Sequence, residues 1–105
     1  MHSMNNLKRL SRFNKLAPEA TNAFWSYDKV ALAGGAIPKK YKELMAIAVA
    51  LTTQCVYCIE LHRQGAIKAG ATEEELVEAD HVATALRAGG ALTHGTHLLQ
   101  SDGAE

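Results

Sequence analysis

The chain contains little proline and no excess of charge of either sign. Its 105 residues include two prolines, and the 11 lysines and arginines are matched by 11 acidic residues. Nucleic-acid-binding proteins usually carry a basic excess or a basic stripe, and proteins that bind anionic membrane surfaces carry polybasic segments. The balanced charge therefore argues against a nucleic-acid partner and against a membrane-surface partner.

Long apolar runs are also absent. The longest, residues 44–51, has eight residues, and no apolar segment typical of a secretory signal follows the first six residues. A membrane-spanning helix needs about 20 predominantly apolar residues. The sequence therefore predicts a cytoplasmic protein without a membrane partner.

Cysteine is equally scarce, with Cys55 and Cys58 as the two cysteines of the chain. Because they lie three residues apart, they cannot join distant parts of a fold. Small secreted domains usually carry more cysteines at wider spacing. A Cys-x-x-Cys pair in a cytosolic protein indicates redox chemistry or metal binding instead.

The length of the chain fits one domain, and its hydrophobic content of 48% is ordinary for a globular protein. We expect a single domain over residues 1–105. Its ends, residues 1–6 and 101–105, are predicted to be frayed.

Helical signals run along the whole chain, and the alternating stretches typical of strands are missing. Pro18 suits the first turn of one helix and Pro38 the start of another. Gly34-Gly35 and Gly70 are typical of helix ends. The sequence therefore predicts an all-α fold of five to six helices, with an antiparallel helix pair that carries the two cysteines. The expected helices cover residues 7–15, 18–32, 38–53, 55–69, 73–88 and 91–100.

Two of these helices carry further signals. Residues 44–51 of the third are apolar on every face, which is typical of a buried helix and, in a chain this small, indicates a covering partner subunit. Thr72 and Glu75 form the pattern of a capping box at the start of the fifth, and Gly89-Gly90 is expected to end it. Its buried stripe is predicted to consist of Leu76, Ala79, Ala83 and Leu86.

The stretch from Glu43 to His62 combines residue types that carry redox chemistry, in the pattern E-x11-C-x2-C-x3-H. Cys55 and Cys58 lie one helical turn apart, so their side chains share a helix face. Cys55 also falls where the fourth helix is expected to begin, and the free N–H groups and the positive dipole end there favour a thiolate. A thiolate attacks peroxides and disulfides, and a second thiol resolves the product to a disulfide.

His62 and Glu43 are the candidates for moving protons at this dithiol. His62 lies four residues after Cys58 on the same face, where a neutral imidazole is able to take the thiol proton directly or through one water. A tight turn near Gln54 between two antiparallel helices would bring Glu43 beside His62, where a carboxylate orients the imidazole. The helix dipole favours Cys55 as the more acidic thiol, whereas the spacing to His62 favours Cys58.

Other interpretations of these residues stay open. The two cysteines are also compatible with a pair of buried small hydrophobic residues. With His62 they supply three of the four ligands that a structural zinc site needs, although the remaining histidines form no second ligand pair at the usual spacing. Glu43 is also compatible with a solvated carboxylate paired with Lys39 or Lys40.

The chain resembles the AhpD-like alkylhydroperoxidases of the carboxymuconolactone decarboxylase family in the segment KELMAIAVALTTQCVYCIELHRQGAIKAGATEEELVEA. The resemblance covers residues 24–99, and the spacing of the glutamate, the cysteines and the histidine carries most of it. It implies an all-α fold whose units associate as homo-oligomers, either trimers or hexamers. The best-known members have a histidine immediately before the second cysteine, where this chain has Tyr57.

The resemblance also implies a thiol peroxidase that uses a redox-active disulfide and no bound cofactor. In such an enzyme Glu43 relays a proton through His62. Cys58 attacks the hydroperoxide and becomes a sulfenic acid, which Cys55 resolves to a disulfide. A dithiol donor, such as a lipoyl group on a carrier protein, then restores the thiols. The decarboxylase branch of the family works without this cysteine pair, which argues against lactone decarboxylation.

Two alternatives from other functional classes are kept. One is a non-catalytic redox-sensing oligomeric protein, which would form the disulfide with little turnover. The other is a zinc-holding structural module, which would lose helicity when a chelator removes the metal.

Overall fold

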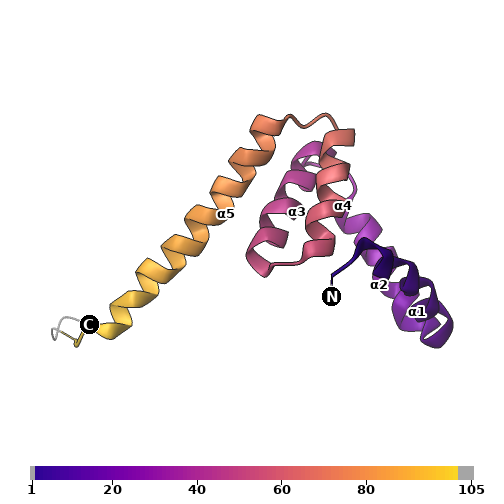
Figure 1. The fold of residues 1–105 in the computed structure, drawn as a ribbon, viewed down its shortest axis with the longest axis horizontal. Coiled ribbons are helices and arrows are strands. Elements are labelled where there is room, and N and C mark those ends of the chain that lie inside the picture. The colour runs from indigo at the N-terminus through magenta and orange to yellow at the C-terminus, as the bar shows by residue number, and fades with distance from the viewer. Residues whose placement is uncertain (1, 102–105) are drawn as a thin grey trace.

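The structure, a computed structural model, describes residues 2–101, and its regular elements are helical (Figure 1). No strand occurs among these residues, so the predicted all-α fold is confirmed. In chain order the elements are the 3-10 helix η1 (Met4–Arg9), α1 (Leu10–Leu16), α2 (Pro18–Leu32), α3 (Lys39–Thr53), α4 (Val56–Lys68), α5 (Glu73–His94) and the 3-10 helix η2 (Gly95–Leu98).

Helices α3 and α4 lie antiparallel at the centre of the fold (Figure 1). Gln54 joins them in the left-handed backbone conformation, with φ 59°, and Cys55 follows as the N-cap of α4. The Cys55 N–H donates back to the carbonyl of Ala50 at 3.0 Å, which closes the turn. The tight turn that the sequence predicts near Gln54 is therefore present, and it fixes where α4 begins.

A small apolar core lies where α3, α4 and the start of α5 meet. Ile47, Ala66 and Ala71 are buried there. Leu44, Leu51 and Leu76 pack against them from α3 and α5. Because Ala66 carries only a methyl group and is fully buried, it allows α4 to approach α3 closely.

Helix α5 begins with the capping box that the sequence predicts. The Glu75 N–H donates to Thr72 Oγ1 at 3.2 Å, and the Thr72 N–H donates to Glu75 Oε1 at 2.9 Å. These reciprocal bonds form the predicted capping box, which satisfies two N–H groups that otherwise lack a partner at a helix start.

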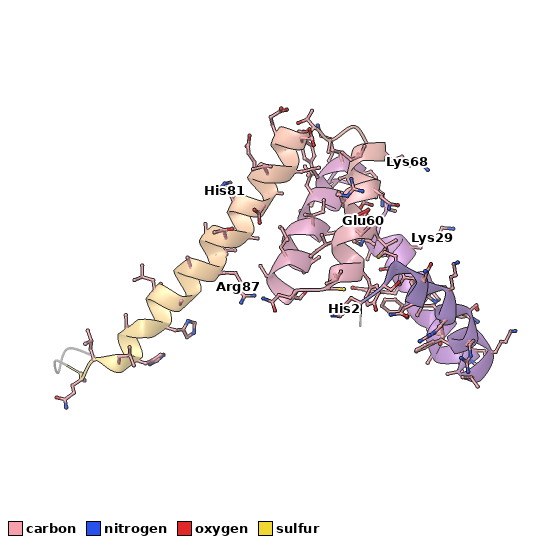
Figure 2. The ribbon with its side chains drawn as sticks, in the orientation of Figure 1. His2, Lys29, Glu60, Lys68, His81 and Arg87 are labelled. Carbon is pink, nitrogen blue, oxygen red and sulfur yellow. The ribbon has the colours of Figure 1, made fainter. Side chains whose placement is uncertain are left out.

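The end of α5 differs from the prediction. The helix continues through Gly89-Gly90 to His94 instead of ending there, so the separate helix expected over residues 91–100 is wrong. A glycine inside a helix costs about 1 kcal/mol but removes no hydrogen bond, and no proline follows to break the helix. Arg87 also ties the middle of α5 to α3, because its guanidinium donates to the carbonyl of Thr52 (Figure 2).

The predicted stripe of α5 is correct in its first half only. Ala83 is buried and Leu76 packs on the core, whereas Leu86 is 69% exposed. The reason is the direction of α5, whose C-terminal half extends away from α3 and α4 (Figure 1). Its 22 residues make it the longest helix, but no helix in the described part of the chain is long and apolar enough to cross a membrane.

The chain is far more extended than a compact domain of its size. Its radius of gyration is 18.2 Å, whereas a compact domain of about 100 residues has roughly 13 Å. Its accessible surface is 8287 Å², against about 5,700 Å² for a compact monomer of this mass. Apolar side chains of α3 and α5 supply part of this surface, among them Met45, Val49, Val82 and Leu86.

The predicted frayed ends fall partly outside the described residues, which exclude 1 and 102–105. Within the described part, residues 4–6 already belong to η1, and Ser101 follows η2 without regular structure.

Candidate functional site

The two cysteines meet at the first turn of α4. As the N-cap, Cys55 has an extended backbone, and its Sγ accepts a hydrogen bond from the Cys58 N–H at 3.3 Å. A sulfur therefore takes the position that an oxygen of Ser, Thr or Asp usually has at a helix start. Both cysteines are free thiols, and both are partly buried.

The two thiols differ in pKa. The pKa of Cys55 is lowered, first by a hydrogen bond from the Cys58 side chain and then by the backbone N–H groups of Cys58 and Tyr57. The pKa of Cys58 is raised to about 11, because its thiol bonds to Cys55, because it is partly buried, and because negative charge on Cys55 and Asp28 faces it. Cys55 is therefore the more acidic thiol of the pair.

Glu43 and His62 form the second half of the site. Glu43 Oε2 lies 2.7 Å from His62 Nδ1, although 19 residues separate the two in the sequence. The contact between Glu43 of α3 and His62 of α4 that the sequence indicates is thus present. Glu43 is only 5% exposed, which makes it the one buried charged residue in the described part of the chain.

The carboxylate of Glu43 stays ionised in this position. Burial acts to raise its pKa, but hydrogen bonds from Lys39 and His62 outweigh burial and hold the pKa below the ordinary value. An ionised carboxylate only accepts hydrogen bonds, so Nδ1 of a neutral His62 is the donor. The lone pair of the imidazole then lies on Nε2, which is the atom free to take a proton.

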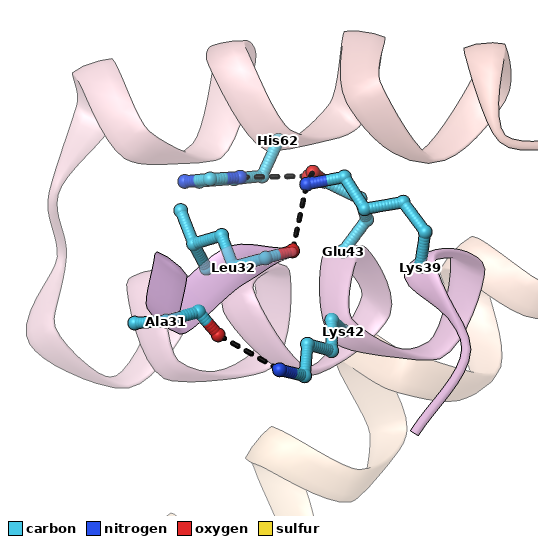
Figure 3. A network of polar contacts seen from close by, with 6 residues as sticks. All are labelled: Ala31, Leu32, Lys39, Lys42, Glu43 and His62. Carbon is cyan, nitrogen blue, oxygen red and sulfur yellow. Dashed lines mark hydrogen bonds and ion pairs between the residues drawn. The ribbon is translucent and has the colours of Figure 1, made fainter. Parts of the chain in front are cut away.

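Two lysines join this pair to the end of α2 (Figure 3). Lys39 Nζ lies 2.8 Å from Glu43 Oε1 and also donates to the carbonyl of Leu32 at 2.8 Å. Lys42 Nζ donates to the carbonyl of Ala31 at 2.9 Å. Both ammonium groups satisfy carbonyls that a helix end leaves without a partner.

The interpretation of Glu43 as a carboxylate paired with Lys39 or Lys40 is therefore correct for Lys39 only. The carboxylate of that pair is buried, not solvated. Lys40 instead pairs with Glu75 at 2.9 Å.

Gly65 leaves space for the carboxylate of Glu43, a role that the sequence patterns did not predict. A Cβ at Gly65 would lie 2.6 Å from Glu43 Oε2, a distance that real Cβ atoms do not reach. Gly65 lies inside α4, one turn after His62 and on its face. The signal in the sequence was a glycine in the middle of a helix, where it costs about 1 kcal/mol relative to alanine and usually has a packing reason.

We expect Gly65→Ala to destabilise the protein by about 1–3 kcal/mol, because the new methyl group displaces the Glu43 carboxylate from His62. The matched control is Gly89→Ala in α5, where a Cβ meets nothing within 4 Å. That variant is expected to gain up to about 1 kcal/mol from helix propensity. Urea unfolding of both variants measures the difference. Equal stabilisation by both substitutions would show that Gly65 makes no room for Glu43.

A groove of about 620 Å³ lies between α2, α3 and α4. Cys58 and His62 both line it, whereas Cys55 is not among its lining residues. Its walls are mostly apolar, with Asp28 and Lys42 as charged members. The other lining residues are Tyr27, Ala31, Leu32, Met45, Ala46, Val49, Ala50 and Thr53. A small molecule in this groove would meet Cys58 and the imidazole of His62 together.

Tyr57 lies under the N-terminal segment. Its hydroxyl accepts a hydrogen bond from Asn6 Nδ2 at 2.9 Å, and the ring of His2 meets its ring edge-on with centroids 5.6 Å apart. Tyr57 therefore anchors η1 to the start of α4.

Three further histidines, His81, His94 and His97, lie on or after α5, away from this site. His81 projects from α5 on the side away from α3 and α4 (Figure 2). His94 and His97 have ring centroids 6.0 Å apart near the end of α5. Within residues 2–101, no group of three or more His, Cys, Asp or Glu side chains is arranged to hold a metal ion, so the zinc alternative gains no support.

Comparison with known proteins places these features in a family. The model of the carboxymuconolactone decarboxylase family matches residues 18–101. The chain is 42% identical over 90 residues to uncharacterized protein 4 in cox locus of Paracoccus denitrificans, covering 86% of this chain and 81% of that protein. It is 32% identical over 71 residues to an uncharacterized protein of Cupriavidus necator, of which it spans 63%.

Two solved structures share the fold. A carboxymuconolactone decarboxylase family protein from Legionella pneumophila superposes with a TM-score of 0.75 at 37% identity, over 88% of this chain and 82% of that one. A protein from Methanobacterium thermoautotrophicum gives a TM-score of 0.79 at 30% identity, over 84% of this chain and 99% of that one.

Proposed function

Because the chain belongs to the carboxymuconolactone decarboxylase family, we propose that it is a thiol peroxidase of the AhpD-like type, which reduces hydroperoxides through a Cys55–Cys58 dithiol. The observation that carries this proposal is the partly buried contact of 2.7 Å between Glu43 and His62 in a fold where His62 shares a groove with Cys58. A base held by a carboxylate beside a thiol is the arrangement that activates a nucleophile.

The first step uses the thiol that needs a base. A hydroperoxide in the groove meets Cys58, whose proton goes to Nε2 of His62 directly or through one water, while Glu43 stabilises the imidazolium. The Cys58 sulfur attacks the outer peroxide oxygen and breaks the O–O bond. The alkoxide that leaves takes a proton from His62, so the products are the alcohol and a sulfenic acid at Cys58.

The second step uses Cys55, the thiol whose pKa is lowered. Cys55 loses its proton to the solvent, and its sulfur attacks the sulfenic sulfur of Cys58. The S–O bond breaks, the hydroxide that leaves takes a proton from the solvent to become water, and the disulfide forms. The low pKa of Cys55 suits this role, since the thiolate is the attacking form. A dithiol donor, such as a lipoyl group on a carrier protein, then reduces the disulfide and is itself oxidised.

The test is the consumption of an organic hydroperoxide with dihydrolipoamide as reductant. The matched control is the Cys55→Ser/Cys58→Ser double variant, which reports the reaction of reductant and peroxide without the dithiol. Saturable turnover by the wild type above this control supports the peroxidase. Wild-type protein that forms the disulfide but turns over no faster than the control is the redox-sensing alternative.

The protein is also proposed to work as a homo-oligomer, a trimer or a hexamer. The surface beyond that of a compact monomer, on the order of 2,500 Å², is ample for a permanent interface, to which each partner contributes about 1,000 Å² or more. We expect sedimentation equilibrium at micromolar concentration to give a mass of three or six chains of 11.3 kDa. A monodisperse species of one chain would contradict this assembly.

A further inference from the structure

Lys39 lies between the Glu43–His62 pair and α2, which forms one wall of the groove. Its ammonium bonds Glu43 Oε1 at 2.8 Å and the carbonyl of Leu32 at 2.8 Å (Figure 3). The other oxygen of Glu43 belongs to His62, at 2.7 Å. Each carboxylate oxygen therefore has one partner, with a permanent positive charge on one side and an imidazole on the other.

The charge on the two sides of Glu43 determines what His62 is able to do. A buried carboxylate that faces an imidazole alone favours the protonated imidazolium, because an opposite charge within hydrogen-bond distance stabilises it. A protonated His62 has no lone pair and cannot accept a proton from Cys58. A lysine that already balances the carboxylate removes most of this preference, while the hydrogen bond to Nδ1 still orients the ring.

We propose that Lys39 is a positioning residue for the dithiol site, which keeps His62 a neutral base by balancing the charge of Glu43 and fixes both to the α2 wall of the groove. As a role in catalysis this inference rests on the proposed peroxidase function. The electrostatic part concerns only Lys39, Glu43 and His62, and it is measurable without any substrate.

Other charged and titratable groups also face His62 and must be separated from Lys39. The groove that His62 lines also holds Asp28 from α2, Lys42 from α3 and the thiol of Cys58 from α4. Asp28 and Lys42 carry opposite charges. The ammonium of Lys42 bonds the carbonyl of Ala31, the neighbour of the carbonyl that Lys39 bonds. Lys42 is therefore a matched control, with the same kind of contact to α2 and without the 2.8 Å contact to Glu43 that Lys39 makes.

The experiment is an NMR titration of the His62 imidazole in the full-length reduced protein. In Lys39→Met, the midpoint of this titration is expected to move to higher pH by about one unit, because the carboxylate then faces the ring alone. Lys39→Arg restores the wild-type midpoint, since it keeps the charge. Lys39→Gln keeps a hydrogen-bond donor but not the charge, so it follows Lys39→Met and also serves if Lys39→Met folds poorly.

The Lys42→Met control shows whether the shift of the His62 midpoint is specific to Lys39. Lys42→Met is expected to move the midpoint by less than a third of the Lys39→Met shift. An unchanged midpoint in both Lys39→Met and Lys39→Gln overturns the proposal, and so does an equal shift in Lys42→Met, which would assign the effect to the overall charge of the groove.

The pH dependence of peroxide consumption links the titration to catalysis. Its acidic limb is expected to move with the His62 midpoint in each variant. If the midpoint of the His62 titration shifts in Lys39→Met but the wild type consumes no peroxide, the proposed function fails and the electrostatic role of Lys39 stands. If the wild type consumes peroxide with the same acidic limb in every Lys39 variant, the role of Lys39 fails and the proposed function stands.

Discussion

Cys58→Ser is expected to abolish hydroperoxide reduction, with a loss of about a thousandfold or more, as for the removal of a catalytic nucleophile. A serine hydroxyl at this position is not ionised by a neutral imidazole to any useful extent and has no redox chemistry of its own. Cys58 lines the groove together with His62, whereas Cys55 is not among the groove's lining residues.

Cys55→Ser is expected to complete the first half-reaction, sulfenic-acid formation, but not the second, disulfide formation. Cys58 should still react once with the peroxide and then remain as a sulfenic acid, because the resolving sulfur is gone. The measurement is intact mass after one equivalent of peroxide in the presence of dimedone, which traps sulfenic acids. A dimedone adduct on Cys55→Ser, and none on Cys58→Ser, is the expected result.

The reverse distribution of the adduct would reverse the roles of the two cysteines. This outcome has a physical basis in the site, because the pKa of Cys55 is lowered whereas that of Cys58 is raised to about 11. Attack by the more acidic thiol would mean that ionisation, and not access to the groove and its base, selects the nucleophile.

His62→Gln is expected to slow the first half-reaction by about 10²- to 10⁴-fold, the usual contribution of a general acid–base group. The amide keeps a polar side chain of similar reach but accepts no proton. The rate of sulfenic-acid formation under single-turnover conditions measures this step without the reductant. A loss below about threefold would contradict a role for His62 as the base.

Glu43→Gln provides the companion result, because Glu43 acts through His62 and does not touch the substrate. A smaller loss, about 10- to 100-fold, is expected for this variant alone. The double variant with His62→Gln should be no slower than His62→Gln by itself, since residues that act as one unit are not additive. Additive losses would assign Glu43 an effect separate from His62.

The site was predictable because it depends on local geometry. The sequence predicts a tight turn near Gln54, and helix periodicity then permits a contact between Glu43 and His62. The structure contains both the turn and the contact. Gly65 and the double contact of Lys39 were not predicted. Both depend on how deeply the carboxylate enters the space between two helices, and spacing along one helix does not report that depth.

The arrangement of the outer helices was less predictable for a related reason. The sequence predicted the bounds of α2 and the start of α5, which capping residues and proline determine locally. It placed the end of α5 too early, because a Gly-Gly pair typical of helix ends is also tolerated inside a helix, at a cost of about 1 kcal/mol for each glycine. Leu86 is 69% exposed, so the apolar stripe of α5 does not continue the core at this position.

The peroxidase mechanism is tested most directly by one turnover of the reduced wild-type protein with one equivalent of an organic hydroperoxide and no other reductant. We expect each chain to consume one peroxide, yield one alcohol and lose the mass of two hydrogen atoms as the Cys55–Cys58 disulfide forms. Protein that leaves the peroxide intact, yet forms the disulfide with a thiol-specific oxidant such as diamide, would contradict it.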